Sequence, residues 1–91
     1  MCGIVGMLVR DGLTAEDRAE VAALTDLMVR RGPDDSGSWD DGRACALGFR
    51  RLAIIDLTAG GHQPMVSEDG EHVLVSNAEV YNFRQLRAEL E

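Results

Sequence analysis

The sequence has few basic residues and no long apolar run, and each shortage excludes a class of partner. Sixteen acidic residues against nine basic ones leave a net charge of −7, whereas a nucleic-acid-binding surface needs a cluster of basic side chains. No apolar run approaches the roughly 20 residues that a membrane-spanning helix requires. We therefore expect neither nucleic acid nor a membrane as a partner.

Cysteine and histidine are equally scarce. The two cysteines, Cys2 and Cys45, and the two histidines, His62 and His72, do not lie at metal-ligand spacing, so no metal site is expected. The first apolar run is broken by glycine and lacks a basic start, unlike a signal peptide. Both cysteines are therefore interpreted as reduced thiols of a cytoplasmic protein.

The first third of the chain has the pattern of a strand followed by a helix. Residues 2–9 form a short apolar run, typical of a strand covered on both faces. Thr14 is a good N-cap, and Asp17 suits a capping box. Gly32 is expected to end the helix in the left-handed conformation. The apolar stripe of the helix consists of Val21, Leu24, Leu27 and Met28.

The remaining segments predict four more strands and a second helix. Turn-forming residues make 31–37 and 58–65 loops on local chemistry, and Asp-Gly at 41–42 and 69–70 marks two hairpin turns. The strands are expected at 38–40, 43–49, 52–56 and 72–76. Asn82 should cap the second helix, with Gln85 completing a capping box. The order β-α-β-β-β-β-α predicts an α+β fold in which helices cover one face of an antiparallel sheet.

Cys2 supports two interpretations when it is taken alone. Removal of Met1 would leave it with a free α-amine, and such amines have a pKa of about 7.7–8.0, so that near neutral pH part of the population acts as a base. A thiol beside its own proton acceptor is an activated nucleophile. A free cysteine is more often a small buried hydrophobe. Cys2 by itself does not decide between them.

Two adjacent arginines, Arg50 and Arg51, precede an apolar segment. On a surface they would mean little. An arginine that points inward needs an anionic partner, because a buried unpaired charge is costly, and its planar fork suits a carboxylate. A ligand carboxylate is one candidate partner. His62 is a candidate acid or base, although a single loop histidine is more often structural.

Five segments resemble, in order and over the full chain, the N-terminal glutaminase domain of glutamine-hydrolysing asparagine synthetases. They are MCGIVG at 1–6, RGPDDSG at 31–37, RRLAIIDL at 50–57, GHQPM at 61–65 and NAEVYNFRQLRAELE at 77–91. The resemblance implies a class II glutamine amidotransferase domain with the N-terminal-nucleophile fold, an αββα sandwich. Residues 1–91 would then be the N-terminal part of such a domain, incomplete and without the synthetase domain.

The resemblance also implies roles for individual residues. Cys2 would attack the side-chain amide of glutamine and form a thioester that water hydrolyses to glutamate. The Asn77 side chain and the Ala78 backbone N–H would bind the oxyanion. Arg51 would hold the α-carboxylate of glutamine. The pocket would be lined by Ile54, Ile55 and Glu79. Ala78 departs from the family, which usually has glycine there; its methyl adds bulk and would be strained at a positive φ.

Partners and cofactors follow from the same resemblance. Glutamine would be the substrate, and the ammonia would serve an ATP-using synthetase domain of a longer protein that forms a homodimer. ATP and magnesium belong to that domain, and no cofactor is expected in this chain. The alternative function is a truncated, non-catalytic amidotransferase-like module. Cys2, Arg51 and Asn77 together favour the enzyme, whereas Ala78 and the end of the chain at Glu91 favour the module.

Overall fold

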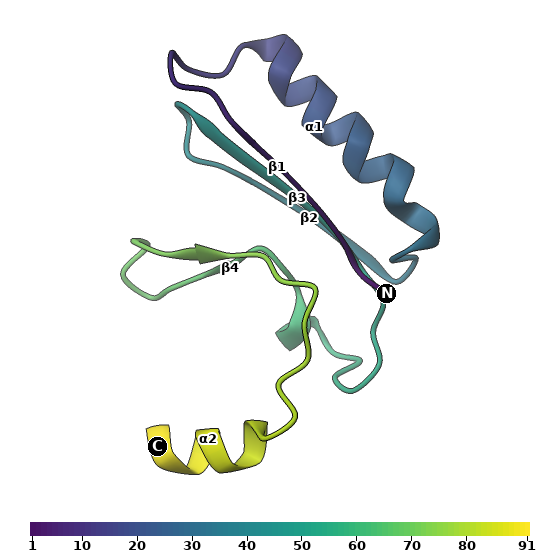
Figure 1. Cartoon of the computed structure of the whole chain (residues 1–91), viewed down its shortest axis with the longest axis vertical. Helices are drawn as coiled ribbons and strands as arrows, with labels where there is room; N and C mark the ends of the chain where they lie inside the picture. The colour runs from purple at the N-terminus through teal and green to yellow at the C-terminus, as the bar shows by residue number, and fades with distance from the viewer.

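The computed structural model describes residues 1–91 as a three-stranded sheet with one helix along it, a two-stranded sheet and a separate second helix (Figure 1). The elements are β1 (Gly3–Leu8), α1 (Ala15–Leu27), β2 (Asp35–Asp40), β3 (Cys45–Arg51), β4 (Met65–Val66), β5 (Val73–Leu74) and α2 (Phe83–Leu90). Two short 3₁₀ turns cover Met28–Arg30 and Ala59–Gly61. The α+β class with two helices and antiparallel strands is confirmed.

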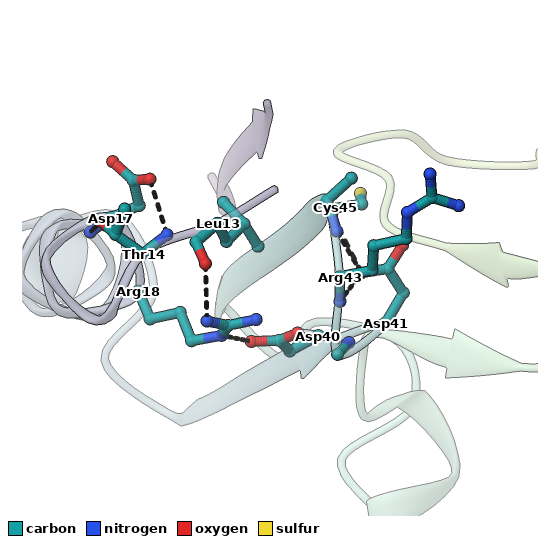
Figure 2. A network of polar contacts seen from close by, with 10 residues as sticks. Leu13, Thr14, Asp17, Arg18, Asp40, Asp41, Arg43 and Cys45 are labelled. Carbon is teal, nitrogen blue, oxygen red and sulfur yellow. Dashed lines mark hydrogen bonds and ion pairs between the residues drawn. The ribbon is translucent and has the colours of Figure 1, made fainter. Parts of the chain in front are cut away.

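β3 is the centre of the larger sheet, whose strand order is β1-β3-β2 with antiparallel pairing throughout. The apolar and small residues of β3 predict this central position. The Asp41-Gly42 turn joins β2 to β3 as expected. Gly42 takes φ +78°, and one carboxylate oxygen of Asp41 accepts hydrogen bonds from the backbone of Arg43, Ala44 and Cys45 (Figure 2). These donors hold the pKa of Asp41 below its usual value, the Cys45 N–H having the largest effect.

α1 begins with the predicted capping box. The Thr14 hydroxyl accepts from the Asp17 N–H at 3.1 Å, and the Asp17 carboxylate accepts from the Thr14 N–H at 2.9 Å. Arg18, one residue further on, bonds Asp40 at the end of β2 through Nε at 2.5 Å and the Leu13 carbonyl at 3.0 Å (Figure 2). This pairing raises the pKa of Arg18 and lowers that of Asp40. It ties the start of the helix to the edge of the sheet.

Two predictions about α1 are wrong. Leu24 and Leu27 are exposed, and the buried helix residues are Val21 and Thr25, because close approach to Gly48 of β3 requires a small residue there. Gly32 does not have a positive φ. A Cβ at Gly32 would instead overlap the backbone of Arg50 and Arg51, so the reason for glycine is close backbone packing.

Three further predictions about elements are wrong. Residues 52–56 form no strand, because they turn away after β3 and pair with no other strand; the fourth strand along the chain is β4. β2 begins within the predicted 31–37 loop, because Asp35–Gly37 pair with the end of β3. Asn82 makes no capping bond, and Gln85 donates to Glu89 instead.

The second sheet is a short hairpin on the side of the first sheet opposite α1 (Figure 1). Its turn at Asp69-Gly70 matches the prediction, with φ +75° at Gly70, while the predicted 72–76 strand is reduced to β5. α2 lies beyond this hairpin, towards the bottom of the view. Neither α1 nor α2 has the length and apolar run that a transmembrane helix requires.

Replacing Gly32 should destabilise the fold. Gly32→Ala forces a methyl into the backbone of β3, and overpacking of this kind costs about 1–3 kcal/mol. The thermal midpoint should therefore fall. Gly6→Ala is the matched control, because its Cβ would meet the flexible end of Leu47 at 3.1 Å and come no closer to the backbone than the Ala46 carbonyl at 3.9 Å. Equal midpoints for the two variants would contradict the close-packing explanation.

Candidate functional site

The register of the larger sheet places Cys2 opposite Arg51 on the neighbouring strand. Gly3 pairs with Arg50 across β1 and β3, so extending the ladder by one residue places Cys2 opposite Arg51. Alternate residues of a strand share a face. Gly3 and Gly48 face α1, with Met28 and Thr25 as their neighbours; Cys2 and Arg51 therefore belong to the opposite face. Asp35 of β2 flanks Arg51 on its other side.

The Cys2 thiol lies against the loop that follows β3. Its Sγ accepts from the Leu52 backbone N–H at 3.3 Å and lies 3.7 Å from the Leu52 carbonyl, to which the thiol donates. Arg31 donates from Nε to the Cys2 carbonyl at 3.3 Å. Cys2 is half-buried and forms no disulfide. It is neither a fully buried core thiol nor a free surface group.

Arg51 is buried although it is charged. Its exposed fraction is 7%, and its guanidinium donates to the backbone carbonyls of Thr58, at 2.6 Å, and of Asp56. Gly61 packs directly on the guanidinium, where a Cβ would overlap it. No carboxylate forms an ion pair with Arg51. Because an arginine has five N–H donors, donors remain for a further acceptor.

A second pair joins the loop at 61–65 to the same face. His62 Nδ1 lies 2.5 Å from a carboxylate oxygen of Asp35. This hydrogen bond is the main reason why the pKa of Asp35 lies below its usual value, with smaller contributions from the Ser36 N–H and the charge of Arg51. His62 is thus an exposed structural partner of Asp35, the more usual role for a single loop histidine.

The predicted residues at 77–79 are not joined to Cys2 or Arg51 by any hydrogen bond. Asn77, Ala78 and Glu79 are exposed on the irregular segment between β5 and α2. Ala78 has no positive φ, so its methyl causes no backbone strain here. Ile54 and Ile55 are also largely exposed, at 65% and 70%. The structure therefore brings together Cys2 and Arg51 and leaves the other predicted residues open to solvent.

Cys45 and the main groove lie elsewhere. Cys45 pairs with Leu8 at the far end of β3 from Cys2, and desolvation, followed by the charges of Asp41 and Asp40, raises the pKa of its thiol. A groove of about 550 Å³ runs between α1 and β2. None of the predicted site residues lines it. The groove and the Cys2 region are separate features.

Sequence reasoning missed three residues that shape the site. The Asp34 carboxylate accepts from the Ala53 N–H at 2.8 Å and so holds the loop after β3. The Gln63 side chain bonds both backbone groups of Ser76, with Ser76 N–H donating to Oε1 at 2.7 Å and Nε2 donating to the carbonyl at 3.3 Å. Gly37 lies under the Gln63 carbonyl, where a Cβ would overlap it. Their presence in the RGPDDSG and GHQPM segments was the only available signal.

Comparison with known proteins identifies a family and several curated relatives. The family model described as a glutamine amidotransferase domain matches residues 1–91. Asparagine synthetase [glutamine-hydrolyzing] 1 of Bacillus subtilis (strain 168) is 41% identical over 93 residues, covering 100% of this chain and 14% of that protein. Asparagine synthetase [glutamine-hydrolyzing] 1 of Lotus japonicus is 40% identical, with 99% and 15% covered. Asparagine synthetase B [glutamine-hydrolyzing] of Escherichia coli (strain K12) is 40% identical, with 98% and 16% covered. The chain thus spans about a seventh of the length of these relatives.

Removing His62 should raise the pKa of Asp35 towards its ordinary value, because the His62 hydrogen bond is the largest cause of the lowering. A carboxyl group with a lowered folded pKa stabilises the fold above its unfolded pKa, and this contribution is lost as pH falls through the folded pKa. His62→Ala should therefore lose stability at neutral pH and little at acid pH. Carboxyl ¹³C NMR titration measures the shift directly.

His72→Ala is the matched control for this titration. His72 Nδ1 lies 4.0 Å from Asp69, whose pKa is lowered chiefly by Ser67. This variant should leave the titration of Asp35 unchanged. If His62→Ala and His72→Ala give the same pKa for Asp35, the His62 hydrogen bond is not the cause of its lowered pKa.

Proposed function

Since the chain belongs to the glutamine amidotransferase domain family, we propose that it carries the glutamine-binding and nucleophilic residues of a domain that hydrolyses glutamine to glutamate and ammonia. The observation that supports this most is the register of β1 and β3, which, extended by one residue, sets Cys2 opposite Arg51, a buried arginine with no carboxylate in an ion pair. A nucleophile and a carboxylate-binding group on one face suit an amino-acid amide substrate.

The proposed chemistry uses Cys2 as the N-terminal residue after removal of Met1. The α-amine takes the thiol proton, and Sγ attacks the side-chain amide carbon of glutamine. The carbon–nitrogen bond breaks as the proton passes to the leaving nitrogen, which departs as ammonia. Water then attacks the thioester, which releases glutamate and restores the thiol. The Leu52 N–H, 3.3 Å from Sγ, would stabilise the thiolate.

Arg51 is the proposed partner of the glutamine α-carboxylate. The loop carbonyls of Asp56 and Thr58 hold its guanidinium in one orientation, and a fixed fork loses little freedom when it pairs with a carboxylate. Without an anion this charge is balanced only by carbonyl oxygens and by the nearby carboxylates of Asp35 and Asp56. A bound carboxylate would complete its hydrogen bonding.

The remaining roles follow the family and rest on position in the sequence. The Asn77 side chain and the Ala78 N–H would bind the oxyanion, and donors of this kind are typically worth about 10²–10³ in rate. Ile54, Ile55 and Glu79 would line the pocket. The fold would be the N-terminal-nucleophile αββα sandwich, of which residues 1–91 form the N-terminal part. The order of α1, the two sheets and α2 across the molecule (Figure 1) is compatible with it.

The activity of the longer protein would be ATP-dependent asparagine synthesis. Its curated relatives are named as glutamine-hydrolysing asparagine synthetases. In this proposal the ammonia released at Cys2 passes to an ATP- and magnesium-dependent synthetase domain outside residues 1–91, within a homodimer. The 91-residue chain by itself would not hydrolyse glutamine.

Cys2→Ala should abolish glutamine hydrolysis by the longer protein that carries this domain, by roughly 10⁴-fold or more, because the covalent step is lost. Glutamate release measures it. Cys45→Ala is the control and should keep full activity, since Cys45 lies at the far end of β3. Unchanged hydrolysis in the Cys2 variant would eliminate the mechanism. No hydrolysis by the wild type would favour the non-catalytic module, and hydrolysis by residues 1–91 alone would eliminate the proposed incompleteness.

Arg51→Lys should raise the KM for glutamine by about 10- to 100-fold with a smaller effect on kcat, because a charge-assisted bidentate pair is worth about 1.5–3 kcal/mol and an ammonium cannot reproduce its geometry. Steady-state kinetics separate the two constants. Arg43→Lys, on the exposed hairpin turn, is the control. A fall in kcat at constant KM would contradict the carboxylate role.

A further inference from the structure

We propose that Gln63 is a positioning residue that holds the oxyanion-binding segment, and this inference rests on the proposed function. Gln63 lies between the two sheets and bonds the backbone of Ser76, the residue directly before Asn77. Its role would be to set where Asn77 and the Ala78 N–H stand without touching the substrate. The Gln63 side chain itself would take no part in the hydrolysis of glutamine.

The first argument comes from the ladder of the second sheet. β4 and β5 pair Met65 with Leu74, so extending the register would place Gln63 opposite Ser76. The backbone pairing of the second sheet ends at Met65 and Leu74 and does not reach this pair. The Gln63 carboxamide offers both an acceptor and a donor in one plane. It bonds the Ser76 N–H and carbonyl as a neighbouring peptide group would, and so continues the ladder.

The second argument is the anchoring of Gln63 itself. Its backbone carbonyl packs directly on Gly37 of β2, where a Cβ would overlap it. The preceding residue, His62, bonds Asp35 of the same strand. Gln63 is therefore fixed to the sheet that carries Arg51, and its side chain reaches across to Ser76. One residue links the strand that flanks Arg51 to the segment that contains Asn77.

The third argument is that nothing else is seen to hold Asn77. The residues at 77–79 are exposed and make no hydrogen bond of their own. Their position therefore depends on the position of the Ser76 backbone that precedes them. An oxyanion donor must lie at about 2.7–3.1 Å from the developing charge, and a displacement of about 1 Å can cost 10²-fold in rate. Loss of the Gln63 contacts would therefore lower the rate.

Gln63→Ala in the longer protein should lower kcat for glutamine hydrolysis by about 10- to 100-fold, while KM changes by less than about threefold, since Arg51 still binds the carboxylate. Gln63→Glu keeps the size and the acceptor for the Ser76 N–H but sets an oxygen against the Ser76 carbonyl, and it should show a similar fall. Gln85→Ala is the control, because Gln85 donates only to exposed Glu89.

Three readouts separate positioning from a general structural effect. Glutamate γ-semialdehyde, whose adduct with Cys2 puts an oxygen in the oxyanion position, should bind more weakly in step with kcat, while glutamate binds as before. In an Asn77→Ala background the effect of Gln63→Ala should largely disappear, since coupled residues are non-additive. In the 91-residue chain, Gln63→Ala should speed amide exchange at Ser76 by about tenfold or more, with Phe49 unaffected.

Each opposite result overturns the inference. The inference is overturned if Gln63→Ala leaves kcat unchanged or if its effect adds to that of Asn77→Ala. It is also overturned if the aldehyde and glutamate lose equal affinity, or if amide exchange at Ser76 is unchanged. The amide exchange does not depend on activity. An inactive wild type with Cys2 intact would overturn the proposed function instead, and the role of Gln63 with it, while an active wild type with a fully active Gln63 variant would overturn only the role of Gln63.

Discussion

The buried guanidinium of Arg51 is the interaction on which the candidate site depends. A charge at this depth needs polar partners, because an unpaired one would be costly. The backbone carbonyls of Asp56 and Thr58 supply them, and so the chain after β3 folds back over the end of the strand. The same turn places the Leu52 backbone beside the Cys2 thiol. One cation therefore shapes the loop and keeps donors free for an anion.

Polar contacts matter between the two sheets because the apolar core is small. Only 8 of 91 residues are buried, and Phe49 is the one large side chain that is fully covered. The larger sheet and α1 approach closely through glycines, as at Gly48 against Thr25. The second sheet is attached chiefly by its loop, through the His62–Asp35 pair and the Gln63 backbone on β2.

Local chemistry predicted those features that a few neighbouring residues decide. The Thr14–Asp17 capping box and the two Asp-Gly turns are present as expected, and the central position of β3 follows from its small apolar residues. Predictions that needed distant partners were wrong. Residues 52–56 are apolar enough for a strand but have no neighbouring strand to pair with, and Thr25 takes the buried position expected of Leu24 because Gly48 faces it.

The sequence by itself determined the α+β class, the family and the residues that carry the proposed chemistry, because these depend on residue types and motifs along the chain. Only the tertiary structure decided that Cys2 lies beside a residue 50 positions away, that Arg51 is buried without an ion pair to a carboxylate, and that Gln63 reaches Ser76. The physical reason is register. Antiparallel pairing joins distant residues through backbone hydrogen bonds, and side-chain pattern alone does not specify which residues will face each other.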